Sequence, residues 1–243
     1  MVSTVVLSTS LLGACGDTDD SLQESSLEIR SRLRSEVHVF QEMDVSRLRI
    51  EPDALRLGGE LYSAYCASCH GNDGDSQDGV TNLAAGVFAY GSDEQAIRTT
   101  ISNGRRSEMP ALGKHLGEVE IGQIVAYVQS LTSDRPASTM AERGDVLFAE
   151  YCAVCHGTDG RGITELGAPN LTDSYWQHGN SMMAIRLAIT RGLEAICPPQ
   201  SDNFLQTEID LLTAYVMNLS GQSVSDETLR LSEAPDSTST TAR

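Results

Sequence analysis

The sequence predicts an all-α protein built from two tandem copies of one small domain, each with about three main helices. Three observations lead to this fold class. At 243 residues the chain has room for two domains of under about 100 residues each. Its apolar residues recur at helical spacing, and no alternating strand pattern of comparable length is present. One stretch of sequence also occurs twice.

The internal repeat gives the boundaries of the two copies. Residues 61–66 match residues 147–152 at an offset of 86, and further along the offset becomes 88, as between Tyr127 and Tyr215. The predicted organisation is an export signal with a lipobox at 1–15, a polar tether at 16–56, a first domain at 57–132, a linker at 133–139, a second domain at 140–221 and a disordered tail at 222–243. A short element at Val37–Phe40, within the tether, is expected to pack on a domain.

Each copy carries the pattern of three helices. In the first copy, leucine and tyrosine recur at helical spacing over residues 57–65, directly before a cysteine motif. Ser92 and Gln95 form a capping box that opens the middle helix, and Gly104 ends that helix. The last helix covers residues 118–131, where four branched side chains share one face: Ile121, Ile124, Val125 and Val128.

The charge and the N-terminus indicate an exported protein. A formal net charge of −17 argues against a nucleic-acid binder and favours a surface that docks basic partners or is well solvated. Residues 1–15 form a short apolar run that ends Leu12-Gly13-Ala14-Cys15, which resembles a bacterial lipobox. Lipid on Cys15 would hold the protein on the extracytoplasmic face of a membrane. No later stretch approaches the roughly 18 continuous apolar residues that a spanning helix needs. An ordinary cleaved signal is the alternative, because no Lys or Arg precedes the apolar run.

Six cysteines first raise the hypothesis of a disulfide framework, but their placement argues against it. Four of them lie in two Cys-x-x-Cys-His motifs at equivalent points of the repeat, and these motifs consist of Cys66, Cys69, His70, Cys152, Cys155 and His156. Such a motif attaches haem c through its two thiols and supplies the proximal iron ligand through its histidine. A zinc site would need a further pair of ligands nearby, and a redox thiol pair would need a βαβ pattern.

The motifs and the stretches around them carry a family likeness. These stretches are ISNGRRSEMP at 101–110, AYVQSL at 126–131, YCAVCHGTDGRG at 151–162, and GAPNLTD at 167–173 followed by Trp176. The copies resemble class I cytochrome c domains, and in particular the haem domains of subunit III of cbb3-type cytochrome oxidases. The resemblance covers about Leu57–Leu219 and implies two covalently bound haem c groups. The oxidase subunit has a transmembrane anchor, which a lipid at Cys15 would replace here.

The resemblance also implies the distal ligands. In that family the methionine of the Met-Pro string binds iron opposite the histidine, so Met109 is expected to serve the haem of His70. At the offset of 88, Cys197 stands where Met109 stands. The other cysteines are assigned to haem or to lipid, so Cys197 has no disulfide partner, and a ferric iron could bind its thiolate. We therefore expect His156 and Cys197 to bind the second haem, whose reduction potential should be much lower than that of the first.

Other distal ligands for the second haem stay open at this point. The iron of that haem could be five-coordinate beside an unligated Cys197, or it could be bound by Met182, Met183 or His178. The two methionines fall at the start of the middle helix, a poor place from which to reach iron. His178 and His115 fall in loops and are expected to face solvent.

The expected function is electron transfer at a membrane surface, with redox proteins as donor and acceptor and no nucleic acid. Nothing that resembles a general base, a nucleophile or a second metal site accompanies the motifs, so we expect an electron carrier rather than a stand-alone enzyme. The runner-up is a dihaem oxidoreductase acting on a small sulfur compound, similar to thiosulfate dehydrogenase, and only Cys197 points to it. A haem-based sensor would need an output domain, for which the chain has no room.

Overall fold

The computed structural model describes residues 31–76, 80–133 and 138–221 of the chain. Within these residues the regular secondary structure is helical apart from one two-stranded ribbon, which confirms the predicted helical class. Following a helix over residues 31–37, the elements are η1 (His38–Phe40), α2 (Val45–Leu48), α3 (Pro52–Tyr65), α4 (Ala67–His70), α5 (Glu94–Asn103), β1 (Arg105–Met109), α6 (Glu118–Ser130), α7 (Thr139–Tyr151), α8 (Ala153–His156), η2 (Thr164–Leu166), α9 (Met182–Arg191), β2 (Leu193–Cys197) and α10 (Gln206–Leu219). The export signal with Cys15, and the tail at 222–243, lie outside the described residues.

The local signals that end the helices act largely as predicted. Helix α6 covers the predicted stretch to within one residue, and its four branched side chains are all buried. Gly104 caps α5 with a φ of 67°. The start of α5 differs from the prediction: the N-cap is Asp93 rather than Ser92, because its carboxylate accepts a hydrogen bond from the backbone N–H of Ala96 at 2.9 Å.

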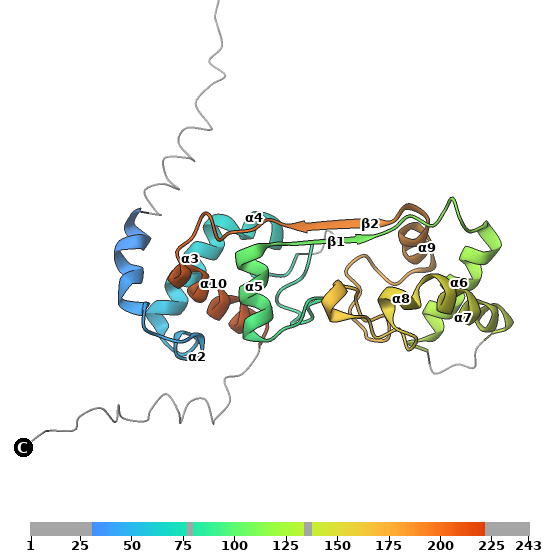
Figure 1. Ribbon diagram of the computed structural model, residues 1–243. Helices are drawn as coiled ribbons and strands as arrows, with labels where there is room; N and C mark the ends of the chain where they lie inside the picture. The colour runs from blue at the N-terminus through green and yellow to red at the C-terminus, as the bar shows by residue number, and fades with distance from the viewer. Residues whose placement is uncertain (1–30, 77–79, 134–137, 222–243) are drawn as a thin grey trace, which may run out of the picture.

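The two copies exchange their last helices, and this exchange was not predicted. Helix α10 of the second copy packs on α3 and α5 of the first, whereas α6 of the first copy packs on α7 and α9 of the second. We call the unit that contains α3, α4, α5 and α10 the first half, and the unit that contains α6, α7, α8 and α9 the second half. Each half has its own apolar core. Figure 1 shows the first half on the left and the second half on the right.

A glycine allows the two helices to cross closely in each half. A Cβ on Gly144 of α7 would lie 2.0 Å from the carbonyl oxygen of Gln123 on α6. At the matching point of the first half, a Cβ on Gly58 of α3 would lie 2.6 Å from the carbonyl oxygen of Leu211 on α10. An aromatic pair accompanies each crossing, with ring centroids 5.3 Å apart in the first half and 5.1 Å apart in the second; the rings are those of Tyr62 with Tyr215, and Tyr127 with Phe148.

An antiparallel ribbon joins the halves. Strand β1 leads from α5 towards α6 and strand β2 leads back from α9 towards α10, so the chain crosses between the halves in both directions (Figure 1). The register pairs Arg105 with Cys197 at one end and Met109 with Leu193 at the other. Five residues of strand extend over roughly 13 Å between the first and last Cα atoms. The ribbon therefore places Met109 and Cys197 at opposite ends.

The segment 31–56, which was predicted as part of a polar tether, is instead a folded part of the first half. It buries six apolar side chains in that core: Leu33, Val37, Phe40, Val45, Leu48 and Ala54. The predicted element at Val37–Phe40 is present as the end of a helix and the turn η1. Two charged residues of the first helix of this segment, Arg32 and Glu36, form ion pairs with Glu60 and Arg56 of α3.

The domain boundaries 57–132 and 140–221 describe the repeat but not the packing. Each half takes its last helix from the other copy, because β1 and β2 carry the chain across before α6 and α10 begin. Of the predicted linker at 133–139, residues 134–137 lie outside the described residues and Thr139 opens α7. None of the described helices is long and apolar enough to span a bilayer.

Candidate functional site

Both Cys-x-x-Cys-His motifs fold into the same helical turn. In the first half, Cys66 caps the end of α3, and its carbonyl oxygen accepts hydrogen bonds from the N–H groups of Cys69 at 3.1 Å and His70 at 2.9 Å. In the second half, the corresponding distances to the Cys152 carbonyl are 3.1 and 3.0 Å. Residues three and four apart lie on one face of a helical turn, so each turn presents two sulfurs and one imidazole to the same side.

The two histidines are held in the tautomer that leaves Nε2 free to bind a metal. The Nδ1 atom of His70 lies 2.9 Å from the carbonyl oxygen of Thr81, and that of His156 lies 3.1 Å from the carbonyl oxygen of Pro169. A carbonyl oxygen only accepts, so Nδ1 carries the proton and donates it in both cases. The other ring nitrogen, Nε2, then keeps its lone pair. Thr81 and Pro169 occupy equivalent positions of the repeat.

The environment of His156 favours the neutral imidazole. Its side chain is buried, and this burial lowers the pKa of His156, while the hydrogen bond to Pro169 opposes that shift. Burial acts on the first cysteine of each motif as well: it raises the pKa of both the Cys66 and the Cys152 thiol to about 11. Both groups are therefore thiols rather than thiolates at neutral pH, which disfavours disulfide exchange. None of the four motif cysteines forms a disulfide bond.

The residues around each turn fit a covalent haem c. Half-buried apolar side chains flank both turns at matched positions, Leu83 and Phe88 in the first half and Leu171 and Trp176 in the second. Such side chains suit the flat apolar face of a macrocycle, which would complete their burial. The motif thiols would bond to the vinyl groups, the histidine Nε2 would bind the iron, and the haem would supply one-electron chemistry.

The distal candidates are placed crosswise to the expectation from the repeat. Met109, expected with His70, packs instead on the core of the second half, to which Cys152 and Trp176 also belong. Cys197, expected with His156, lies near Cys69 of the first motif, close enough for their charges to interact. The reason is the exchange of helices: each distal candidate stands at the end of a strand that has already crossed to the other half.

Two glycines allow the end of each strand to pack closely on the helix end of the other copy, and the sequence alone did not reveal this role. Gly104 and Gly192 both have positive φ, 67° and 71°. A Cβ on Gly104 would lie 2.4 Å from the carbonyl oxygen of Cys197, and a Cβ on Gly192 would lie 2.4 Å from that of Met109. Each glycine therefore supports the distal candidate of the other copy, in addition to ending its own helix.

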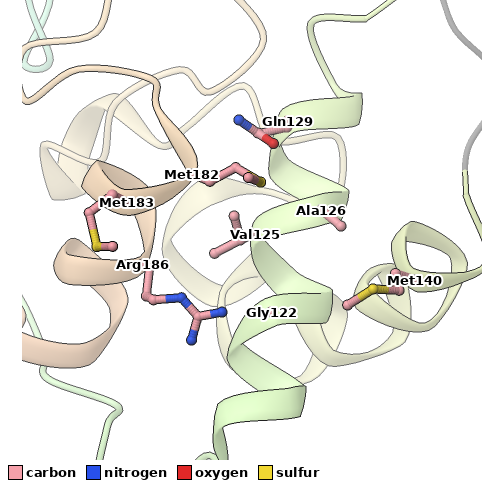
Figure 2. A pocket seen from close by; sticks show the side chains of 8 residues that line it. All are labelled: Gly122, Val125, Ala126, Gln129, Met140, Met182, Met183 and Arg186. Atoms are coloured by element: carbon pink, nitrogen blue, oxygen red, sulfur yellow. The ribbon is translucent and has the colours of Figure 1, made fainter.

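The remaining candidates lie on the outer surface. His115 and His178 are exposed, as expected. Met182 and Met183 of α9 are 65% and 61% exposed. Figure 2 shows them on one side of α6, with Met140 of α7 on the other. The groove between them has a volume of about 310 Å³ and is lined by Gly122, Val125, Ala126, Gln129, Met140, Met182, Met183 and Arg186. These residues include neither a motif cysteine nor a motif histidine, so the groove is separate from the attachment turns.

Hydrogen bonds connect the first attachment turn to the second half. The peptide that joins Thr81 to Asn82 accepts from His70 through its carbonyl and donates through its N–H to the phenol oxygen of Tyr175, at 3.0 Å. Tyr175 belongs to the loop that carries Trp176 in the second half. This contact was also missed, because nothing in the spacing of the repeat brings residues 82 and 175 together.

Known proteins match the chain over both copies of the repeat. A family model described as cytochrome c oxidase, cbb3-type, subunit III matches residues 53–128 and 139–216. The chain is 34% identical over 182 residues to the cbb3-type cytochrome c oxidase subunit CcoP of Rubrivivax gelatinosus, covering 74% of this chain and 60% of that protein. It is 35% identical over 183 residues to the subunit FixP of Azorhizobium caulinodans, covering 70% and 62%. The chain thus spans about three fifths of the length of these relatives.

Proposed function

The chain belongs to the family of subunit III of cbb3-type cytochrome c oxidases, and on this premise we propose that it carries electrons between its two haems and delivers them to an oxidase of that type. Its two cytochrome c domains carry two covalent haem c groups. The observation that carries the proposal is the matched pair of attachment turns, each with its histidine fixed by a backbone carbonyl.

The chain's own residues would perform three tasks in this function. Cys66, Cys69, Cys152 and Cys155 would fix the haems covalently, and the carbonyls of Thr81 and Pro169 would orient the two histidines. The apolar walls would exclude water. The peptide between His70 and Tyr175 would couple the first haem site to the second half by hydrogen bonds, which favours transfer between the halves.

Within this function, His70 and Cys197 would be the ligands of one iron, and His156 and Met109 those of the other. This assignment follows the positions of Met109 and Cys197 at opposite ends of the ribbon. A neutral thioether stabilises ferrous iron and raises the potential, whereas an anionic thiolate stabilises ferric iron. The first half would therefore hold the low-potential haem and the second half the high-potential haem.

Membrane attachment through lipid on Cys15 is a finer part of the proposal. It is supported by the Leu12-Gly13-Ala14-Cys15 string and would hold the haem domains at the periplasmic face. A second candidate function, oxidation of a small sulfur compound, rests on Cys197 alone, because the sequence has a cysteine here at the position that Met109 occupies in the other copy.

The test uses the full chain matured in a host that makes c-type cytochromes. We expect a mass gain of two haems that persists after denaturation. The reduced protein should be oxidised by a purified cbb3-type oxidase in the presence of oxygen, and it should show no turnover with thiosulfate, tetrathionate or peroxide. Turnover with one of these compounds, without transfer to the oxidase, would replace the carrier by the enzyme.

A further inference from the structure

Arg105 lies directly across the ribbon from Cys197. Directly opposed residues of an antiparallel pair point to the same face, with Cβ atoms about 5 Å apart. On β1 this face carries the half-buried positions Arg105, Ser107 and Met109, whereas Arg106 and Glu108 are exposed on the other face. The guanidinium of Arg105 thus shares a partly desolvated face with the sulfur of Cys197.

The side chain of Arg105 is held in place from two directions. Its Nε donates a hydrogen bond to the hydroxyl of Thr100 at 3.0 Å, and its guanidinium lies 4.6 Å from the ring centroid of Tyr90. Among the described residues it takes part in no ion pair with a carboxylate, whereas its neighbour Arg106 pairs with Glu194 at 2.6 Å. The positive charge of Arg105 is therefore both fixed and uncompensated by an acid in the described part of the chain.

The other end of the ribbon shows the complementary arrangement. Leu193, which occupies the position of Arg105 in the second copy, lies across from Met109. A neutral side chain thus faces the neutral thioether, and a cation faces the sulfur that can become an anion.

We propose that Arg105 is the counter-ion of Cys197, whose guanidinium favours the thiolate that binds iron opposite His70 over any neutral ligand that competes for that position. The inference rests on the proposed ligation by Cys197 and adds to it a positioning residue. Its physical basis is the attraction between opposite charges at a partly buried site, where water screens them poorly.

The experiment measures imidazole binding to the ferric, fully matured protein by absorbance and low-temperature EPR. Imidazole is a neutral ligand, so it displaces the thiolate more easily once the counter-ion is gone. Arg105→Gln should raise the affinity for imidazole at the thiolate-ligated haem by roughly tenfold, the factor that about 1.4 kcal/mol produces. Arg105→Lys keeps the charge and should recover most of the wild-type affinity.

Two further variants make the result specific. Arg106→Gln removes the same charge from the outer face of β1 and should leave imidazole binding unchanged. In a Cys197→Met background, Arg105→Gln should also leave the affinity for imidazole unchanged, because imidazole then replaces a neutral ligand. The wild type, the two single variants Arg105→Gln and Cys197→Met, and the double variant form a double-mutant cycle.

The outcomes separate the two proposals. A thiolate EPR signal in the wild type, together with equal imidazole affinity in wild type and Arg105→Gln, would overturn the role of Arg105 and leave the ligation standing. If Arg105→Gln changed the affinity for imidazole equally in the wild-type and the Cys197→Met backgrounds, the role of Arg105 as counter-ion would also be overturned. The charge of Arg105 would then act on the haem or on the fold rather than on Cys197. Absence of the thiolate signal from the wild type would remove the ligation by Cys197, and the counter-ion with it.

Discussion

Cys197 and Arg105 are opposed residues of the ribbon, at the end that adjoins the first attachment turn. The repeat implied that Cys197 serves the second haem, whereas the ribbon places it near the first attachment turn. This position of Cys197 determines which experiments distinguish the two haems.

Variants with one haem should show which distal ligand serves which site. Replacing Cys66 and Cys69 by Ala should leave one haem, and the thiolate EPR signal should disappear with the lost haem, because Cys197 lies in the first half. Replacing Cys152 and Cys155 by Ala should instead abolish the spectrum of methionine-ligated iron. Survival of the thiolate signal in the first variant would restore the pairing by repeat position.

Exchanging the distal residues should move one potential at a time. Cys197→Met replaces an anionic sulfur by a neutral one, so the lower wave of a redox titration should rise by on the order of 0.1 V or more, within the roughly 0.8 V that axial ligation spans. Met109→Cys should lower the upper wave. If Cys197→Met leaves both waves and the EPR spectrum in place, another residue binds that iron or the position is open.

The glycine at the helix crossing of the second half should tolerate no side chain. A Cβ on Gly144 would meet the backbone of α6 at 2.0 Å, and we expect Gly144→Ala to cost about 2–3 kcal/mol of stability, measured by thermal unfolding of the holoprotein. Gly122→Ala is the matched control. It lies inside α6 facing the flexible ends of Arg186 and Met140, so it should be neutral or add up to about 1 kcal/mol. Equal effects of the two substitutions would contradict the crossing.

Lipid attachment can be tested at one atom. Cys15→Ser removes the thiol that acylation requires, so the variant should appear in the soluble fraction after cell lysis, with both haems present. Ser3→Cys, which places a thiol elsewhere in the same segment, should not restore membrane attachment to the variant. Recovery of wild-type protein in the soluble fraction with an unmodified Cys15 would reject the anchor.

The sequence was sufficient to predict the helices, the repeat and the attachment turns, since each depends on local features. Gly104 ends α5, the branched residues of α6 are buried, and each histidine follows its two cysteines in one turn. The cap of α5 was misplaced by one residue because Ser92 and Asp93 are both good capping residues, and local chemistry alone does not choose between them.

The exchange of helices could not be predicted from the repeat, because the two copies have equivalent interfaces. Tyr127 and Tyr215 occupy the same position of the last helix, and Gly58 and Gly144 the same position of the first, so either helix fits either partner. The positions of Met109 and Cys197 at opposite ends of the ribbon could not be predicted for the same reason. In the segment 31–48 only Val37–Phe40 was expected to pack on a domain. The rest was missed because its buried residues are spaced among charges, and only the packing on α3 and α10 shows which side chains are inside.

The exchange also constrains the order of biosynthesis. In a tandem array of independent domains, the first can finish folding while the second is still being translated. Here α10, which closes the core around α3 and α5, follows all the other described helices along the chain. The N-terminal attachment site therefore acquires its full surroundings only after the residues of the second half have been made, and a stop codon before Gln206 damages the haem site that was made first.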